Sequence, residues 1–405
     1  MLLSIVTFIL FFFVLYWVYN GYLLFLFLYN RFNSTPSSPI IADEKHPDIY
    51  MIVPTYNEEK MISDKIENIR AAKVSNKRLH VIFVDGGSID NTSNIIQQNI
   101  NNESNWHFIQ SSLRGKINQL NFALGTLDNI PPSSIIVNSD VDALLDSNSV
   151  ELIAETLAHN VHIGLVGGNI HPSDLAIGLE SQHWLQQNRW RMIESVLYSC
   201  SSVVAPCYGF RRNLIDRFPD DCIADDLYLA YFANSKGLLV KYLPDANGQE
   251  TRAPESYVEY IVHKFRKTNA CLKEAFRFLT LINNYPFQWK VIYSVKVLQL
   301  ILSPFIILFL IPFSIILFFG PYPLPAVVII VCGFFIASVM LTTRMLLKIS
   351  GLQHPDIKKD IRGTPFSLIV SLLLMTLIVI ASLISYPFYR QTSCYTKVSP
   401  NKDGA

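Results

Sequence analysis

The first thirty residues carry no charged side chain, and this stretch limits the folds that the chain can adopt. From Met1 to Asn30 the sequence consists mainly of Phe, Leu, Val and Tyr. A helix of ~20 apolar residues crosses the hydrocarbon core of a bilayer. The segment lacks the basic start and the small-residue cleavage site of a signal peptide. We therefore expect residues 1–30 to form an uncleaved transmembrane anchor.

Three more apolar runs of membrane-spanning length lie near the carboxyl end. They are Val297–Phe319, Ala326–Leu347 and Phe366–Phe388. Lys and Arg gather in the loop before the last run, and cytosolic loops carry such an excess. We therefore expect an integral protein of the cell or inner membrane. Its middle region lies in the cytosol, three spans occupy residues 297–388, and a short tail follows at 389–405.

The composition excludes some classes of function. The chain has 405 residues and a formal net charge of +1. A protein that binds nucleic acid usually carries a marked basic excess, so we expect no nucleic-acid partner. The six cysteines form no C-x-x-C pair, and we expect them to be small buried side chains.

Runs of strand length alternate with helical patterns in the middle region. The expected strands are 49–53, 79–84, 106–109 and 134–137, and the expected helices are 58–72, 91–100 and 117–127. This alternation predicts an α/β fold with a parallel sheet that helices cover on both faces. Ligands of such sheets bind beyond the carboxyl ends of the strands.

Four acidic residues follow the expected strand ends: Glu58, Asp85, Asp140 and Asp142. Any one of them is as often a turn or cap residue. Together at one edge of a sheet they indicate a site for a cation and a phosphorylated ligand. Carboxylate oxygens of the D-x-D type suit Mg²⁺ or Mn²⁺, which keeps its other positions for water and phosphate.

Five short motifs occur in a fixed order. They are Val53-Pro54-Thr55-Tyr56-Asn57-Glu58, Val84-Asp85-Gly86-Gly87-Ser88, Gly115-Lys116 with Leu120-Asn121, Asp140-Val141-Asp142 and Ala224-Asp225-Asp226. The series resembles the inverting family 2 glycosyltransferases, whose GT-A domain is a doubly wound mixed sheet. The resemblance covers about residues 48–275, and the GT-A domain itself is expected at 48–255. With one amino-terminal and about three carboxy-terminal spans, the chain is similar to the membrane-integrated branch of cellulose, hyaluronan and poly-N-acetylglucosamine synthases.

The resemblance implies a role for each matching residue. The nucleotide sugar would contact Pro54, Tyr56, Glu58, Asp85, Lys116 and Asp140. The metal ion would bind Asp142 and Asp140, and the catalytic pair would be Asp225 and Asp226, with Asp226 as general base. Many members have a second Asp where this chain has Gly86, which affects the expected contact with the nucleotide base. An inverting displacement needs one base for the attacking hydroxyl and a cation for the departing diphosphate.

Gln186–Trp190 reads QQNRW and has the form Q-x-x-R-W, which polymerising relatives use near the acceptor. In those relatives the motif follows the acidic pair, whereas here it precedes Asp225 by more than thirty positions. We therefore interpret it as coincidence on an amphipathic helix whose aromatic rings lie at a membrane or protein surface.

The segment at the family's position reads His263-Lys264-Phe265-Arg266-Lys267. Arg266 matches the family arginine, and Lys267 replaces the tryptophan. The resemblance implies that Arg266 and His263 contact the acceptor or the diphosphate. Residues 256–288 are expected to form basic amphipathic helices at the membrane surface.

The sequence therefore predicts transfer of a sugar from a nucleotide sugar, UDP-linked by preference, to a polysaccharide. Membrane lipids are expected partners. Four spans are few for a closed channel, so a homo-oligomer or a partner subunit is a further possibility. A single transfer to a polyprenyl phosphate remains the alternative, and a catalytically silent scaffold is another. A nucleotidyltransferase is disfavoured by the acidic pair at Asp225-Asp226.

Overall fold

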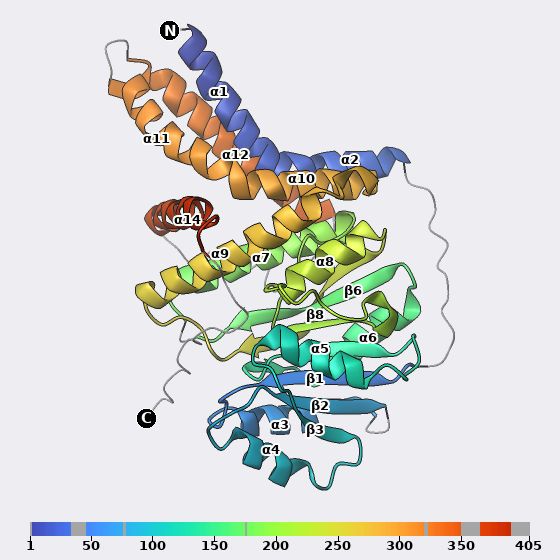
Figure 1. Cartoon of the computed structure of the whole chain (residues 1–405). Coiled ribbons are helices and arrows are strands. Elements are labelled where there is room, and N and C mark those ends of the chain that lie inside the picture. The colour runs from blue at the N-terminus through green and yellow to red at the C-terminus, as the bar shows by residue number, and fades with distance from the viewer. Residues whose placement is uncertain are drawn as a thin grey trace.

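The computed structural model describes residues 2–33, 46–75, 78–174, 176–319, 323–349 and 365–389. An α/β domain lies beside a bundle of apolar helices that both ends of the chain contribute (Figure 1). The basic loop expected before the last apolar run falls mostly at 350–364, outside the described residues. The expected tail is also outside them, apart from Tyr389.

The domain contains an eight-stranded mixed sheet in the order β3-β2-β1-β4-β7-β6-β8-β5. The strands are β1 Ile49–Thr55, β2 Leu79–Asp85, β3 Trp106–Gln110, β4 Ile135–Ser139, β5 Ala143–Leu145, β6 Ile163–Pro172, β7 Cys207–Arg211 and β8 Leu239–Glu250. β3, β2, β1 and β4 are parallel, as the alternation of strands and helices predicts. β7 runs antiparallel to both β4 and β6, which makes the sheet mixed and confirms the predicted fold class.

Short helices cover the sheet. They are α3 Ile62–Arg70, α4 Thr92–Ile100, α5 Lys116–Thr126, α6 Ser149–His159 and α8 Asp225–Ser235. On α3 the side chains of Ile62, Ile66 and Ile69 are spaced by three or four positions, so they share one face and are buried in the core. The predicted start of this helix at Glu58 is too early. Residues 58–61 form a turn in which Glu58 accepts hydrogen bonds from the main-chain N–H groups of Met61 and Ile62.

Two longer helices, α7 Gly178–Leu197 and α9 Tyr257–Leu279, lie between the sheet and the apolar helices (Figure 1). The side chain of Ser256 caps α9 by accepting a hydrogen bond from the main-chain N–H of Glu259 at 3.2 Å. On its other side α9 packs along α14 Pro365–Ser385, where the Tyr260 hydroxyl contacts the Met375 sulfur at 3.3 Å. Helices α7 and α9 therefore separate the α/β domain from the apolar helices.

The apolar segments differ in whether they form single spans. Helices α1 Leu2–Tyr16 and α2 Tyr22–Asn33 join through a π-helical turn into one segment, Leu2–Phe32, of 31 residues. Helix α12, Pro325–Ile349, contains a second segment long and apolar enough to cross a membrane. In α14 the described side chains, Val370–Ser385, form an apolar stretch that is shorter than a span.

The expected run Val297–Phe319 does not form one straight helix. It divides between α10 Phe287–Ile301 and α11 Ser303–Phe319, which meet at an angle of 50°. Pro304 has no N–H to donate to the carbonyl of Leu300, which accounts for the break. Within the described residues there are thus two helices of spanning length, or three if this bent pair counts as one span.

Candidate active site

A cavity of about 1900 Å³ begins at the carboxyl ends of β1 and β4. Among the residues predicted for the site, it is lined by Pro54, Tyr56, Glu58, Lys116, Asp140, Asp142, Asp225, Asp226, His263 and Arg266. The cavity continues past α7 and α9 to residues of α10, α11, α12 and α14. Four of the five motifs therefore meet at one cavity, although they are separated by up to about 170 positions in the sequence, and the motif at Val84–Ser88 contributes no lining residue.

Asp85 is placed differently from the other predicted residues. It is fully buried, and its carboxylate accepts hydrogen bonds from the main-chain N–H groups of Gly87 at 3.1 Å and Ser88 at 2.9 Å. The Ser88 hydroxyl also donates to it at 2.5 Å. The carboxylate therefore closes the turn after β2 and does not line the cavity in this conformation. The predicted contact with a nucleotide base requires this turn to rearrange.

Gly86 has a packing reason to be glycine. A Cβ atom at this position would lie 3.0 Å from the side-chain nitrogen of Gln119. That nitrogen donates to the main-chain carbonyls of Thr55 at 2.6 Å and Val84 at 2.7 Å, so it ties β1 to β2. An aspartate at position 86, as in many relatives, would have to displace this amide.

Lys116 connects the D-x-D turn to the acidic pair. It is the first residue of α5, and its ammonium lies 2.8 Å from an oxygen of Asp140 and 3.1 Å from an oxygen of Asp225. The preceding Gly115 has a φ of 106°, a conformation that a residue with a side chain rarely adopts. The turn that glycine permits is what directs Lys116 across the cavity to both carboxylates.

Lys65 holds the two residues that flank the D-x-D turn, Ser139 and Ala143. It is fully buried on α3, and its ammonium donates to the Ser139 hydroxyl at 2.6 Å and to the Ala143 carbonyl at 2.5 Å. Burial lowers the pKa of Lys65 to about 8, although Cys207 and the two carboxylates of the turn act in the opposite direction. The sequence reasoning missed this residue because nothing in its local pattern distinguishes it from a surface lysine.

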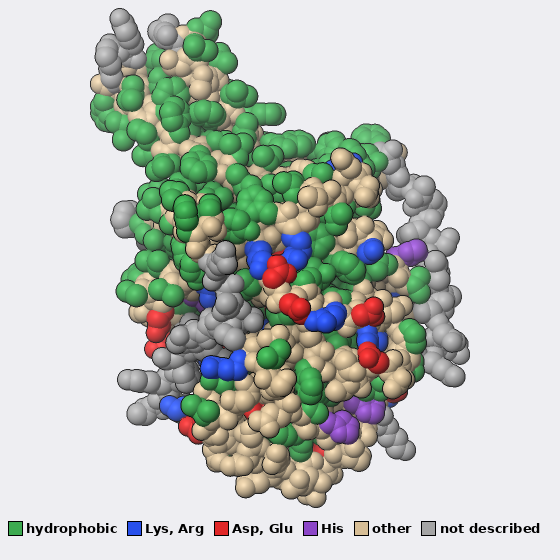
Figure 2. All heavy atoms as spheres, in the orientation of Figure 1, with side chains coloured by type: hydrophobic (Ala, Val, Ile, Leu, Met, Phe, Trp, Pro, Cys, Tyr) green, Lys and Arg blue, Asp and Glu red, His purple; other side chains and the backbone are tan. Residues whose placement is uncertain are grey.

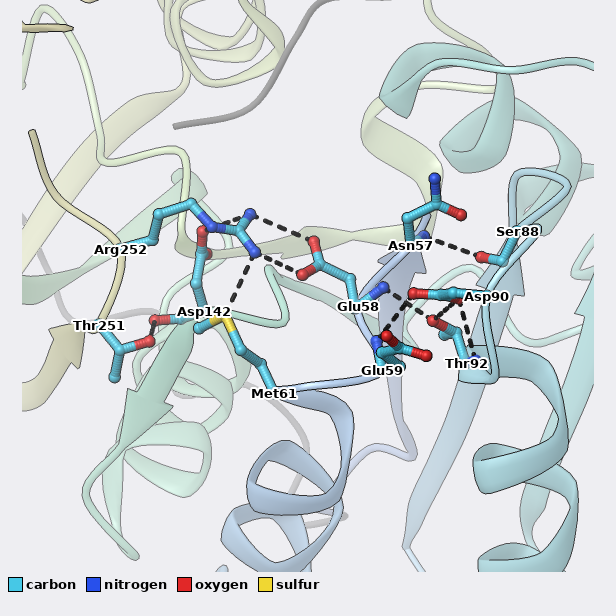
Figure 3. Close-up of polar contacts among 10 residues, drawn as sticks. All are labelled: Asn57, Glu58, Glu59, Met61, Ser88, Asp90, Thr92, Asp142, Thr251 and Arg252. Atoms are coloured by element: carbon cyan, nitrogen blue, oxygen red, sulfur yellow. Dashed lines mark hydrogen bonds and ion pairs between the residues drawn. The ribbon is translucent and has the colours of Figure 1, made fainter. Parts of the chain in front are cut away.

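Asp142 and Glu58 share one partner, Arg252, which was also missed. The guanidinium reaches both oxygens of Glu58, at 2.5 and 3.2 Å, and one oxygen of Asp142 at 3.4 Å (Figure 3). Arg252 lies two residues beyond the end of β8. Glu58 is therefore not an open ligand for a nucleotide in this conformation.

The two members of the acidic pair have different environments. Asp225 is buried, and one of its oxygens accepts a hydrogen bond from the Tyr208 hydroxyl at 2.6 Å and faces Lys116. Asp226 is partly exposed on the cavity at the first turn of α8. Its burial, reinforced by the charge of Asp225, raises the pKa of Asp226 to about 6, which Lys116 and Lys267 oppose. Of the pair, Asp226 is the carboxylate able to take up a proton near neutral pH.

His263 and Arg266 lie on α9, where a ring nitrogen of His263 is 3.5 Å from the Arg266 guanidinium. Burial, together with Lys267 and Lys264, lowers the pKa of His263 far below its usual range, so the ring is neutral. The Lys267 ammonium lies over the ring of Trp184, 5.6 Å from its centroid. The lysine that replaces the family tryptophan is thus paired with an indole from α7.

The QQNRW segment lies on α7 and lines the same cavity through Gln186, Gln187, Arg189 and Trp190. It therefore reaches the candidate site from a different helix than the family motif does. The rings of α7 do not lie open, since Trp184 is buried and Trp190 is half-buried against the core. The segment therefore lines the candidate site even if its match to the family motif is a coincidence.

The carboxylates of Asp140 and Asp142 fit a divalent cation. Both belong to the turn between β4 and β5, both line the cavity, and both face cationic side chains, Lys116 and Arg252. Two hard oxygen donors with space for water and phosphate beside them are what Mg²⁺ requires from a protein. A divalent cation here would share the two carboxylates with Lys116 and Arg252.

Comparisons with known proteins agree with this geometry. Residues 50–218 match the family model described as "Glycosyl transferase family 2". The poly-beta-1,6-N-acetyl-D-glucosamine synthase of Staphylococcus aureus is 27% identical over 156 residues, which cover 38% of this chain and 36% of that protein. An N-acetylglucosaminyltransferase of Neorhizobium galegae is 21% identical over 270 residues, covering 62% of this chain and 61% of that one. The chain thus aligns with less than two thirds of the length of either relative.

A solved structure shares the fold. The mannosyltransferase PcManGT from Pyrobaculum calidifontis, determined in complex with GDP-Man and Mn2+, superposes with a TM-score of 0.64. The superposition covers 93% of this chain and 97% of that one at 20% sequence identity. It therefore includes the helices at both ends as well as the sheet. Residues 50–218 of this chain therefore match glycosyl transferase family 2, and the GT-A-like fold agrees with that match.

Proposed function

We propose that this protein is a membrane-bound inverting glycosyltransferase that moves a sugar from a nucleotide sugar to a glycan. One observation carries the proposal: the D-x-D turn, Lys116 and the acidic pair line a single cavity at the carboxyl ends of the parallel strands. Nucleotides bind at that edge of doubly wound sheets. The same cavity continues to the membrane-length helices, where a long or lipid-linked acceptor has room.

Each residue has a task in this proposal. Asp142 and Asp140 hold Mg²⁺ or Mn²⁺, which supplies positive charge to the departing diphosphate. Lys116 adds a second cation on the same side. Asp226 accepts the proton of the acceptor hydroxyl as that oxygen attacks the anomeric carbon from the opposite face, so the configuration inverts. Asp225 stays bound to Tyr208 and Lys116 and fixes the first turn of α8.

The donor in this proposal is a UDP-linked sugar. Two relatives are named for N-acetylglucosamine chemistry, and that sugar is commonly carried on UDP. The solved mannosyltransferase was determined with GDP-Man, so GDP sugars belong in the test as well. Tyr56, whose ring lies 4.3 Å from the Arg114 guanidinium, and Pro54 form the wall nearest to where the nucleotide enters.

A lipid-linked acceptor is the second candidate, and the lining of the cavity favours it. Beyond α9 the walls are largely apolar and come from the apolar helices α11, α12 and α14, with Ile307, Phe335, Val339 and Leu372 among them. Arg344 is a cation in that part of the wall, and Lys296 lies there as well but pairs with the buried Glu194. An apolar passage that contains a cation suits a polyprenyl phosphate as well as a glycan.

The proposal also places the protein in a membrane with the catalytic domain in the cytosol. Nucleotide sugars are cytosolic metabolites, so an active domain needs that side. Hydrophobic side chains cover the helical part of the molecule in the view of Figure 2, whereas charged groups gather over the α/β domain. Membrane lipids are therefore direct partners of α1, α11 and α12.

The decisive experiment is transfer by membranes that contain the full chain. Radiolabelled UDP-N-acetylglucosamine, UDP-glucose and GDP-mannose are supplied with Mg²⁺ or Mn²⁺, and an Asp226→Asn preparation serves as control. Label in high-mass aqueous material that is absent with Asp226→Asn supports a polysaccharide product. Label in the organic extract supports the lipid acceptor. If no nucleotide sugar binds in the presence of Mn²⁺, the proposal fails and a catalytically silent scaffold replaces it.

A further inference from the structure

Arg252 links the two sides of the candidate donor site. Its side chain is 9% exposed and comes from the residue after Thr251, beyond the end of β8. Figure 3 shows its guanidinium between Glu58, which follows β1, and Asp142, which follows β4. One positive charge thus faces two carboxylates inside the cavity wall.

The two ion pairs are unequal. Glu58 is 3% exposed and receives two hydrogen bonds from the guanidinium, at 2.5 and 3.2 Å. Asp142 is 16% exposed, and its ion pair with the guanidinium is longer, at 3.4 Å. A two-pronged charge-assisted pair is stronger and more rigid than a long single contact. Glu58 is therefore the anchor of Arg252, and Asp142 is the partner that can exchange.

The backbones on both sides are fixed independently of the guanidinium. The main-chain carbonyl of Asp142 accepts hydrogen bonds from the N–H of Thr251 at 2.8 Å and from its hydroxyl at 3.1 Å. The main-chain N–H of Glu58 donates to the Thr92 hydroxyl at 2.7 Å. Exchange at Asp142 therefore needs a rotation of side chains and no movement of the sheet.

We propose that Arg252 makes the binding of the divalent cation depend on a nucleoside diphosphate, an inference that rests on the proposed function. Without nucleotide, the guanidinium neutralises Asp142 and repels a cation that approaches it. A diphosphate that enters the cavity offers phosphate oxygens to the same guanidinium. Asp142 is then released as a ligand, while Glu58 keeps Arg252 in place. Cation and nucleotide thus bind as a coupled pair.

This inference gives Glu58 a role other than direct contact with the nucleotide. Its carboxylate holds the guanidinium at the mouth of the D-x-D turn. Because Glu58 and Arg252 are 194 positions apart in the chain, the arrangement exists only in the folded domain. It also explains why an acidic residue and a basic residue are both buried at an edge that has to accept an anionic ligand.

The test is a titration of the purified full chain with Mn²⁺, followed by electron paramagnetic resonance of the free ion. It is run without nucleotide and with saturating UDP, with GDP as a second probe. For the wild type we expect the nucleotide to tighten Mn²⁺ binding by roughly tenfold or more. For Arg252→Gln we expect tighter Mn²⁺ binding without nucleotide and a coupling reduced by about threefold or more, because the direct attraction between the metal ion and the diphosphate remains. Arg252→Lys keeps the positive charge but cannot make the two parallel hydrogen bonds of a guanidinium. Its coupling should therefore lie between those of the wild type and Arg252→Gln.

Arg212→Gln is the matched control. Arg212 pairs with Asp128 at 2.9 Å, its side chain is likewise 9% exposed, and it does not line the cavity. This variant should leave the coupling as in the wild type, and thermal unfolding is recorded for every variant. If Arg252→Gln binds Mn²⁺ no more tightly than the wild type and retains the coupling, the inference is overturned while the proposed function stands. A wild type that binds neither Mn²⁺ nor nucleotide overturns both.

Discussion

At the scale of single residues, two adjacent carboxylates have been given different chemistry by their neighbours. Asp225 is held by the Tyr208 hydroxyl and by Lys116, so its oxygens are engaged. Asp226 lies on the cavity without such a fixed arrangement in this conformation, and its pKa is raised. A carboxylate that faces the cavity and has a raised pKa is a candidate general base.

The first prediction concerns the pH dependence of transfer. Asp226 must be ionised to accept a proton, and its pKa is raised to about 6 by burial and by Asp225. The rate should therefore increase as the pH rises through about 6 and level off above it, and kcat/KM measured between pH 5 and 8 checks this. Asp226→Asn should lower the rate by about 10²–10⁴-fold while UDP binding stays intact. A flat profile, or full activity of the variant, would contradict the assignment.

The sequence predicts some of these residues well, for a physical reason. Asp140 and Asp142 were proposed because strand ends of a parallel sheet meet at one edge. Asp225 and Asp226 were proposed from the resemblance to the family motif. Lys65 and Arg252 could not be found, since their contacts join positions that are 78 and 194 apart and follow no local pattern. Asp85 shows that a residue can match a motif and still have a different role in the structure. Its motif matches the family, yet the turn after β2 uses its carboxylate.

At the scale of elements, periodicity located the parallel half of the sheet to within about two residues. Strands β1 to β4 follow the predicted ranges because buried parallel strands are short apolar runs. Strands β5, β6 and β8 were not predicted. Their place depends on pairing with β7 and with one another, which local patterns do not encode. Pro304 lies inside the run Val297–Phe319, but its effect was not considered because the whole run is apolar. The sequence therefore predicted one span where the structure has two helices at an angle.

The second prediction concerns α7. Trp190 lines the cavity from this helix, whereas α9 presents Lys267 where relatives have a tryptophan. A flat indole offers a stacking surface for a sugar ring, so Trp190→Ala should raise the KM for the acceptor several-fold and leave UDP binding unchanged. Kinetics with varied acceptor and a UDP titration measure the two effects separately. Val196→Ala, an exposed change on the same helix, is the control. Equal loss of nucleotide binding in Trp190→Ala would refute an acceptor-side role.

At the scale of the whole molecule, the two ends of the chain form one unit. The Tyr16 hydroxyl is 2.8 Å from the Thr342 hydroxyl, and the Gln299 side chain donates to the Val18 carbonyl at 2.7 Å. The amino-terminal helix therefore packs among the carboxy-terminal ones rather than acting as a detached anchor. Apolar runs in the sequence predict membrane-length helices. They do not predict which helices pack together, because the hydrogen bonds between those helices join residues more than 280 positions apart.

The last prediction concerns the joint between this unit and the α/β domain. Glu194 of α7 is buried, lies 2.8 Å from the Lys296 ammonium of α10 and accepts a hydrogen bond from the Tyr22 hydroxyl of α2 at 2.7 Å. Burial alone would raise the pKa of Glu194, but Lys296 and these hydrogen bonds lower it below its usual range. A lowered pKa means that the pair stabilises the fold above the unfolded-state value. This contribution is lost as the pH falls through the folded-state value.

Lys296→Met should therefore destabilise the protein by about 3–5 kcal/mol, because it leaves a buried carboxylate without its cation. The double variant Lys296→Met/Glu194→Gln removes both charges and should recover much of the loss, since a neutral amide still suits the Tyr22 hydroxyl. Thermal unfolding of the purified chain in detergent at neutral pH measures both changes. Arg217→Gln, which removes an exposed pair with Asp220, should change stability by less than about 1 kcal/mol. A single variant as stable as the wild type would mean that this ion pair does not help to hold the apolar helices against the α/β domain.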